Sequence, residues 1–88
     1  MNTTAARGPR SSPAAVFGRA LAFERERQAK SMNRLAKIAG THASEVSRLE
    51  RGLRDPRLST MVRLAVALDV PLGVLVAGLG SGGDSRSG

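Results

Sequence analysis

The chain has 88 residues, with 14 Lys or Arg against 7 Asp or Glu, and therefore a formal net charge of +7. This length accommodates one small hydrophobic core. The excess of basic residues favours a polyanionic partner, and the alternative is that these residues only confer solubility. The sequence contains no Cys, Trp or Tyr and two Phe. These counts exclude disulfides and thiolate metal sites and argue against stacking of single-stranded bases, so duplex DNA is the favoured nucleic acid.

Neither export nor a membrane span is expected. The first dozen residues do not contain the apolar stretch of a secretory signal. The apolar run over residues 62–79 is interrupted by Arg63, Asp69 and Pro71, and charged residues are costly inside a bilayer. The expected location is the cytoplasm, with association with the nucleoid when the protein is bound to DNA.

Three parts are expected along the chain. Residues 1–12 are rich in small residues and Arg without an apolar period, and are predicted to be a flexible basic arm. Arg7 and Arg10 in this arm either follow DNA or belong to a passive tail. Residues 13–78 are predicted to form the domain, and residues 79–88, rich in Gly and Ser, a disordered tail.

The first helix is expected from Pro13 to about Gln28. Ser12 is a good N-cap, and Pro13 suits the first helical position, where its missing N–H costs nothing. Its inward stripe, at helical spacing, comprises Phe17, Ala20, Leu21 and the stem of Arg25.

The second helix is expected from Met32 to Ala39, with Ser31 as its N-cap. Gly40 is predicted to end it in the left-handed conformation that helix ends commonly take. The residues predicted to face the core at helical spacing are Met32, Leu35, Ala36 and Ala39.

The third helix follows after about three residues, a spacing typical of two helices joined by a tight turn. It is expected from about Ala43 to Arg51, with Val46 and Leu49 buried and Gly52 ending it. The helix-turn-helix therefore spans about residues 32–51.

Two further helices are expected after the loop LRDPRL. Ser59 is predicted to cap a fourth helix from Thr60 to Leu68, and Pro71 to open a short fifth one through about Ala77. The core face of the fourth helix comprises Met61, Leu64, Ala65 and Leu68. No strand pattern appears in the sequence, so the predicted fold is all-α, with five helices around one core.

A tight pair of short helices on a basic domain is typical of proteins that dock one helix in the major groove. Such a helix is apolar behind, here at Val46 and Leu49, and polar in front, where it contacts bases and phosphates. The side chains turned toward the DNA side are those of Ala43, Ser44, Ser47, Arg48 and Arg51.

The sequence resembles the lambda repressor-like (Cro/repressor type) helix-turn-helix DNA-binding family. The resemblance lies in SMNRLAKIAG from Ser31, THASEVSRLERG from Thr41, the loop residue Pro56, and MVRLAVALDVPLGVL from Met61. It implies a compact five-helix domain, in which residues 32–39 and 43–51 are the DNA-binding pair. It also implies two-fold dimers on palindromic double-stranded operators.

The resemblance also assigns roles to individual positions. It implies base reading by Ala43, Ser44 and Arg48, and Ser47 joins them on the DNA-facing side. It places near phosphates Ser31, Met32, Arg51, Arg54 and Arg57. It further implies a structural ion pair between Arg25 and Glu50, because the family often has a buried or half-buried pair at these positions.

Some residues depart from the family pattern. Met32 stands where the family often has Gln, which helps to grip the backbone, and Met cannot donate that hydrogen bond. His42 occupies an N-cap position where Ser or Thr is more usual, and a capping or phosphate-contacting role is expected for it. Ala43 and Ser44 discriminate weakly between bases, so specificity depends largely on Arg48 binding guanine. Glu45 accepts a hydrogen bond from cytosine, repels phosphate, or is only a solvated acid near a helix N-terminus.

No enzyme chemistry, cofactor or metal is expected. His42 is the only histidine, so neither a zinc ligand set nor a hydrolytic triad can be assembled around it. The acids are scattered and do not form a catalytic pair of carboxylates.

The favoured function is a sequence-specific transcription regulator, expected to be a dimeric repressor that reads the major groove with the helix from Ala43. The alternative is a protein-interaction regulator, an antiactivator or antitoxin, that sequesters a partner protein and binds DNA secondarily. The weak base-reading set favours it, as do three apolar residues near the C-terminus that one short helix cannot all bury, Val74, Val76 and Leu79.

Overall fold

The computed structural model describes residues 12–79, which form five helices and no strand. These helices are α2 (Pro13–Arg27), α3 (Met32–Ala39), α4 (Ala43–Glu50), α5 (Leu58–Leu68) and α6 (Leu72–Val76). The expected all-α, five-helix fold is confirmed. The basic arm at residues 1–12 and the tail at residues 79–88 lie outside the described residues, apart from Ser12 and Leu79.

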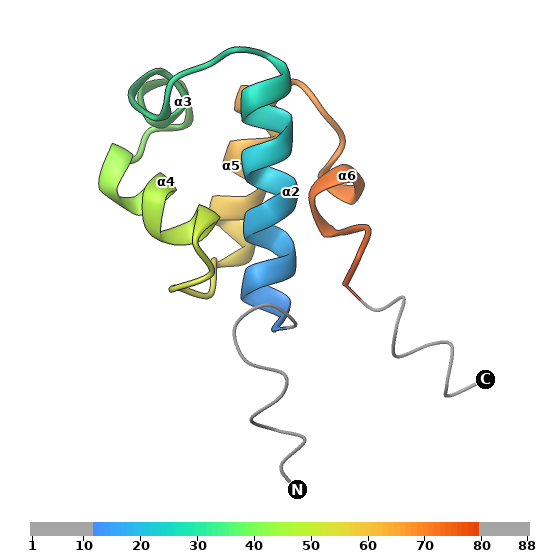
Figure 1. The fold of residues 1–88 in the computed structure, drawn as a ribbon. Helices are drawn as coiled ribbons and strands as arrows, with labels where there is room; N and C mark the ends of the chain where they lie inside the picture. Colours follow the sequence, from blue (N-terminus) through green and yellow to red (C-terminus); the bar gives the residue numbers. More distant parts are fainter. Residues whose placement is uncertain (1–11, 80–88) are drawn as a thin grey trace, which may run out of the picture.

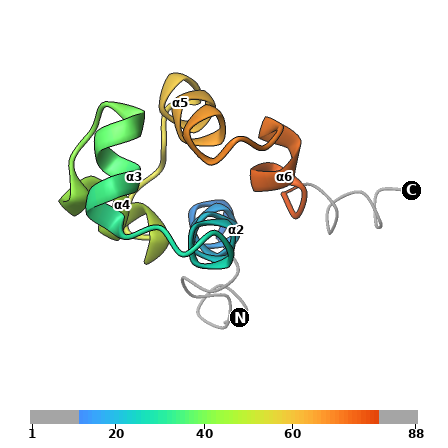
Figure 2. The same cartoon turned by 90° about the horizontal axis from the view of Figure 1, so that it is seen from above.

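The two longest helices, α2 and α5, run beside each other, and the other three are arranged around them (Figures 1 and 2). Viewed from above, α3 and α4 lie on one side of α2 and α5, and α6 lies on the other (Figure 2). Helix α2 packs against α4 and α6, and α5 packs against α3 and α6. The helix-turn-helix is therefore held at one side of the domain.

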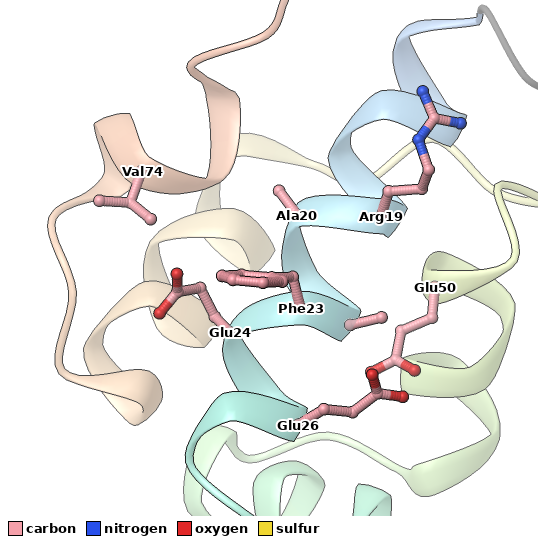
Figure 3. A pocket seen from close by; sticks show the side chains of 8 residues that line it. Arg19, Ala20, Phe23, Glu24, Glu26, Glu50 and Val74 are labelled. Atoms are coloured by element: carbon pink, nitrogen blue, oxygen red, sulfur yellow. The ribbon is translucent and has the colours of Figure 1, made fainter.

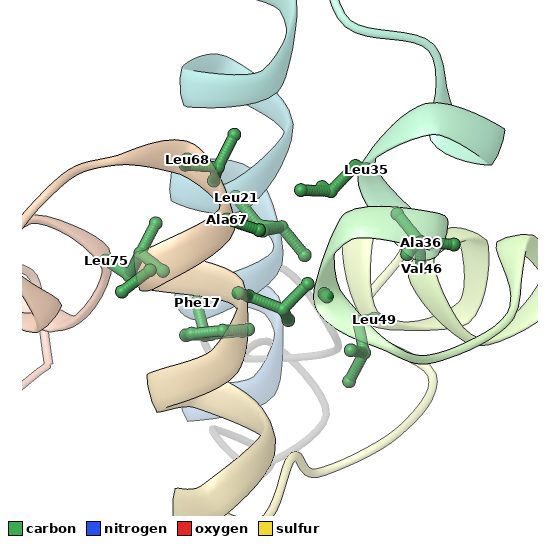
Figure 4. Close-up of a cluster of buried hydrophobic side chains, with 12 residues drawn as sticks. Phe17, Leu21, Leu35, Ala36, Val46, Leu49, Ala67, Leu68 and Leu75 are labelled. Atoms are coloured by element: carbon green, nitrogen blue, oxygen red, sulfur yellow. The ribbon is translucent and has the colours of Figure 1, made fainter.

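The core is built from side chains of all five helices (Figure 4). Its largest fully buried members are Phe17, Leu21, Leu35, Val46, Leu49, Leu64, Leu68 and Leu75. Fully burying a side chain of this kind stabilises the fold by about 1.5–3 kcal/mol, so this small cluster provides most of the driving force. The expected inward stripes are confirmed, with Met32, Ala20 and Met61 only partly buried against the cluster.

Local signals set the starts of α2 and α3. The Ser12 hydroxyl accepts a hydrogen bond from the Ala15 N–H at 3.1 Å, and the Ser31 hydroxyl accepts one from the Arg34 N–H at 3.0 Å. Each satisfies one of the N–H groups that a helix start leaves unpaired. At the end of α3, Gly40 has φ 75°, as the sequence predicts.

The predicted start of α5 is wrong. The helix begins at Leu58, with Arg57 as an extended N-cap whose side chain makes no capping hydrogen bond, so Ser59 is already helical. With this start, the Met61 N–H donates to the Arg57 carbonyl at 3.0 Å, which closes the first turn of the helix. The other boundaries differ by about one residue, within the usual fraying of helix ends: α4 ends at Glu50, and Pro71 is the N-cap of α6.

Candidate DNA-binding surface

The turn between α3 and α4 is short and closed by backbone hydrogen bonds. The left-handed Gly40 lets the Thr41 N–H donate to the Ala36 carbonyl at 2.9 Å. After one extended residue, His42, the chain enters α4. The two helices are therefore held in a fixed relation, and the exposed side of α4 is a rigid surface.

The back of α4 is held against the core and against α2. Val46 and Leu49 are both fully buried. Where α2 crosses α4, a Cβ atom placed on Gly18 would lie 2.2 Å from the Leu49 carbonyl oxygen. Only glycine fits this approach. The importance of Gly18 was not predicted from the sequence, although a Gly inside an otherwise favourable helix costs about 1 kcal/mol and so signals a packing requirement.

The C-terminal end of α4 is held by an ion pair with α2. Arg25 Nε donates to Glu50 Oε2 at 2.6 Å, and Arg25 Nη2 donates to Glu50 Oε1 at 3.0 Å. Arg25 Nη1 also donates to the Lys30 carbonyl at 2.8 Å, so one guanidinium joins the end of α4 to the segment that enters α3. The hydrogen bonds to Glu50 raise the pKa of Arg25 above its ordinary value, and burial opposes them. The two side chains are only 12% and 6% exposed.

The front of α4 carries the residues expected to contact bases. Ser44 and Arg48 are exposed, and Ser47 is half-buried. Ala43 is also half-buried and packs against the core, so its methyl group is only partly available to DNA. Arg48 is the largest exposed side chain of this group.

The residues expected near phosphates differ in how exposed their side chains are and in whether other groups of the protein already bind them. Arg51 and Arg57 are exposed. Met32 is half-buried against the core, and the Ser31 hydroxyl already accepts the capping hydrogen bond from Arg34. Arg54 is engaged by Glu45, with 3.4 Å between Arg54 Nε and Glu45 Oε1.

Charges are distributed unevenly over the domain. Near the end of α2, Arg25 pairs with Glu50, and Arg27 pairs with the largely buried Glu24 at 2.6 Å. On α3, α4 and the loop after α4, five cations within residues 12–79 form no ion pair, namely Arg34, Lys37, Arg48, Arg51 and Arg57. The helix-turn-helix side therefore presents unneutralised positive charge, which attracts phosphates.

His42 is the N-cap residue of α4 by its extended backbone, but its side chain makes no capping hydrogen bond. Of the two roles expected for this side chain, capping is therefore wrong, and contact with a phosphate stays a prediction. The imidazole is exposed, and the first N–H groups of α4 donate no hydrogen bond to it.

Three apolar residues were expected at a protein interface. Val74 is 39% exposed, whereas Val76 and Leu79 are half-buried, and Val76 packs against the core. Larger exposed fractions occur at Phe23 on α2 and at Leu58 and Val66 on α5.

Metal binding and membrane spanning are two further possibilities for residues 12–79. This part of the chain holds no group of three His, Asp or Glu side chains arranged to bind a metal ion. None of its helices is long and apolar enough to cross a membrane.

Known proteins resemble both the sequence and the fold. The helix-turn-helix family HTH_3 matches residues 21–75. The restriction-modification controller protein C.AhdI from Aeromonas hydrophila is 34% identical, with a TM-score of 0.69 over 70% of this chain and 94% of that one. A hypothetical transcription factor, NHTF from Neisseria, is 25% identical, with a TM-score of 0.71 over 88% of this chain and 86% of that one. The search of curated proteins found no match.

Proposed function

This chain belongs to the lambda repressor-like helix-turn-helix family and is a DNA-binding transcription regulator, and we propose that it acts as a dimeric repressor with α4 in the major groove. The observation that carries the proposal is the surface of α4, with a buried back at Val46 and Leu49 and the exposed Ser44 and Arg48 in front. Arg48 binds the O6 and N7 atoms of a guanine, while Arg51 and Arg57 bind phosphates.

Repression follows from the simplest physical effect of binding. A small domain that occupies a promoter blocks other proteins by excluded volume alone. Activation requires a further contact with the transcription machinery. The likeness to a restriction-modification controller protein and to a hypothetical transcription factor supports a regulatory role without deciding its sign.

A stripe of apolar residues on α5 supports self-association. Leu58, Val62 and Val66 are spaced four residues apart and are 64%, 43% and 73% exposed. Residues with this spacing lie on one face of a helix. An exposed apolar stripe of this length is typical of a surface that is covered by another protein.

The stripe is complementary to a second copy of itself in an antiparallel pair. If two α5 helices meet at Val62, Leu58 lies opposite the partner's Val66. Asp69, at the C-terminal end of one helix, then lies near the start of the other, where Arg57 is the N-cap. Antiparallel helices also bring opposite ends of their dipoles together, which is favourable.

This pairing is compatible with DNA binding by both copies. In Figure 2, α5 is viewed nearly along its axis, with α3 and α4 to one side of it and α2 below. A two-fold axis can bring the outward faces of two α5 helices into contact with the helices antiparallel. This axis is perpendicular to the α5 helices and points toward the side of the domain on which α4 lies. It therefore leaves both α4 helices on the same side of the dimer, as two half-sites of one operator require.

The test of the DNA-binding proposal is a titration of the full chain with genomic fragments at several salt concentrations. We expect site-preferring binding whose affinity falls steeply with salt. A chain that binds every fragment equally, or none, would contradict operator recognition.

The dimer is tested separately by the molar mass of the protein alone. Val66→Asp places a charge opposite the partner's Leu58 in the paired stripes and is expected to yield a monomer that still binds single half-sites. Val74→Asp, on α6, is the matched control and should leave the molar mass unchanged. Dissociation by Val74→Asp but not by Val66→Asp would place the interface at α6 instead.

A second candidate function is the sequestration of a partner protein, as an antiactivator or antitoxin does. The supporting observation is an open depression beside α2, where Phe23 is 63% exposed and Val74 borders the same space (Figure 3). Its lining also includes Ala20 and Ala22. Capture from a native lysate by the wild type and by Phe23→Asp tests it. A protein lost with Phe23→Asp while DNA binding persists would favour this function.

A further inference from the structure

The first turn of α4 carries one carboxylate, Glu45, and its partner comes from the loop that follows the helix. Glu45 Oε1 lies 3.4 Å from Arg54 Nε. The two side chains are 24% and 50% exposed, so both remain accessible from solvent. This contact joins the N-terminal part of α4 to the loop that leads to α5.

This orientation is not the one that a helix start by itself favours. A Glu at the third helical position commonly turns back to bind the N–H of the N-cap residue. The Glu45 carboxylate contacts Arg54 instead. Because a Glu side chain on a helix surface otherwise samples several rotamers, the contact with Arg54 restricts where its two oxygens can lie.

Glu45 is also a neighbour of the main expected base-reading residue. Residues three apart on a helix share a face, so Glu45 lies beside Arg48. Arg48 forms no ion pair within residues 12–79, and the acid beside it is bound to Arg54 rather than to Arg48. The exposed side of α4 therefore presents a cation without an ion pair in this part of the chain, next to a carboxylate that contacts a different residue, Arg54.

We propose that Glu45 is a base-reading residue that selects cytosine, and that Arg54 is the residue that positions it. The proposal rests on the proposed function, because it needs α4 in the major groove. It adds a second polar reader beside Arg48 and assigns Arg54 a part in sequence specificity as well as in phosphate binding.

The chemistry follows from the base edges in the major groove. An ionised carboxylate only accepts hydrogen bonds, and the N4 amino group of cytosine only donates them. Guanine and thymine present acceptors at the corresponding edge, so a fixed carboxylate repels them. Adenine offers one donor beside an acceptor and is intermediate. A held Glu45 is therefore most favourable opposite cytosine.

Arg54 is able to hold Glu45 and contact DNA at the same time. A guanidinium has five N–H donors, and the contact with Glu45 involves Nε. The remaining donors lie on the half-exposed part of the side chain, where a phosphate of the same half-site can accept from them. A phosphate contact then fixes Arg54, and Arg54 fixes Glu45.

The experiment is selection of binding sites from random duplexes by the full chain and three variants. Wild type is expected to prefer cytosine about tenfold at one position next to the guanine bound by Arg48. Glu45→Gln should move that preference toward adenine, because Gln pairs with adenine N6 and N7, and should leave the other positions unchanged. Arg54→Ala should weaken the cytosine preference and also lower the overall affinity.

Arg57→Ala is the matched control, because Arg57 is an exposed loop cation without an ion pair in the described part of the chain. It should lower the affinity for all sequences about equally and leave the cytosine preference intact. The proposal is overturned if Glu45→Gln raises the affinity for every sequence without changing any base preference, since Glu45 would then act only by repelling phosphates. If wild type selects no site at all, the proposed function itself fails.

Discussion

The two ends of α4 are held in very different ways. At the C-terminal end, Leu49 is fully buried, Glu50 makes two hydrogen bonds to Arg25, and Gly18 lies against the backbone of the last turn. At the N-terminal end, His42 makes no capping hydrogen bond, and Glu45 makes one contact of 3.4 Å with a half-exposed Arg54.

Within the eight residues of α4, the C-terminal end therefore serves folding stability and the N-terminal end serves DNA recognition. Contacts at the C-terminal end are buried and close, so they set the orientation of the helix on the domain. The N-terminal end keeps polar groups accessible to solvent, where they are able to contact bases. Substitutions at the C-terminal end of α4 should therefore reduce folding stability, and substitutions on its exposed side should change DNA binding.

The largest effect is expected from Gly18→Ala at the crossing of α2 and α4. The new methyl group would meet the Leu49 carbonyl oxygen at 2.2 Å, and neither backbone can move without disturbing the core. We expect a loss of about 4 kcal/mol in the free energy of unfolding, measured by chemical denaturation. Gly73→Ala, where no atom lies within 4 Å of the added Cβ, is the control and should be neutral or slightly stabilising.

Arg25→Ala tests the ion pair at the same end. It leaves the Glu50 carboxylate, only 6% exposed, without its partner. The expected loss of stability is on the order of 3 kcal/mol, measured by thermal or chemical unfolding. An unchanged melting temperature would show that the pair does not hold α4 in place. Arg27→Ala also leaves a largely buried carboxylate, that of Glu24, without its partner, so it should destabilise the fold as well, although by less than Arg25→Ala because Arg27 is 52% exposed.

Arg48→Ala tests the exposed side of α4. We expect a loss of about 2 kcal/mol in discrimination at one base pair, measured by competition between operator variants. The free energy of unfolding should change by less than about 0.5 kcal/mol, because the side chain is exposed. Arg63→Ala, an exposed cation on α5, is the control and should preserve the discrimination. Equal losses for both variants would mean that Arg48 contributes only charge.

The smallest effect is expected at the start of α4. His42→Ser introduces a hydroxyl at an N-cap position that has no side-chain acceptor, and should stabilise the fold by about 1 kcal/mol. His42→Ala, measured in the same denaturation experiment, separates the new cap from the loss of the imidazole. If Ser and Ala give the same stability, the first turn of α4 does not use a cap.

The helices and their inward faces were predictable because the signals for them are local. The hydroxyls of Ser12 and Ser31 bind N–H groups three residues away, and Gly40 ends α3 through its own dihedral angles. Helical spacing of apolar residues identified the buried Val46 and Leu49. The pair of Arg25 and Glu50 came from the family resemblance, since 25 residues separate them and no local pattern links them.

The start of α5 was mispredicted within one local segment, whereas the omissions concern contacts between segments distant in sequence. Ser59 is of a residue type that often caps helices, but Arg57 takes the extended N-cap conformation and α5 begins earlier, at Leu58. Glu45 was interpreted as a base contact, a repelling charge or a solvated acid, and its contact with Arg54 depends on how the loop folds back along α4. The base-reading and phosphate-contacting roles of individual residues stay predictions.

The sequence by itself determined where the helices lie, which of their faces are apolar, and that a basic helix-turn-helix pair is present, because each depends on residues within one or two turns of each other. Only the tertiary structure decided that Gly18 lies against α4, that Arg54 contacts Glu45, and that Leu58, Val62 and Val66 stay exposed. The physical reason is that close approach, ion pairing and exposure depend on where separate helices meet. The spacing of residues along the chain does not specify these meeting points.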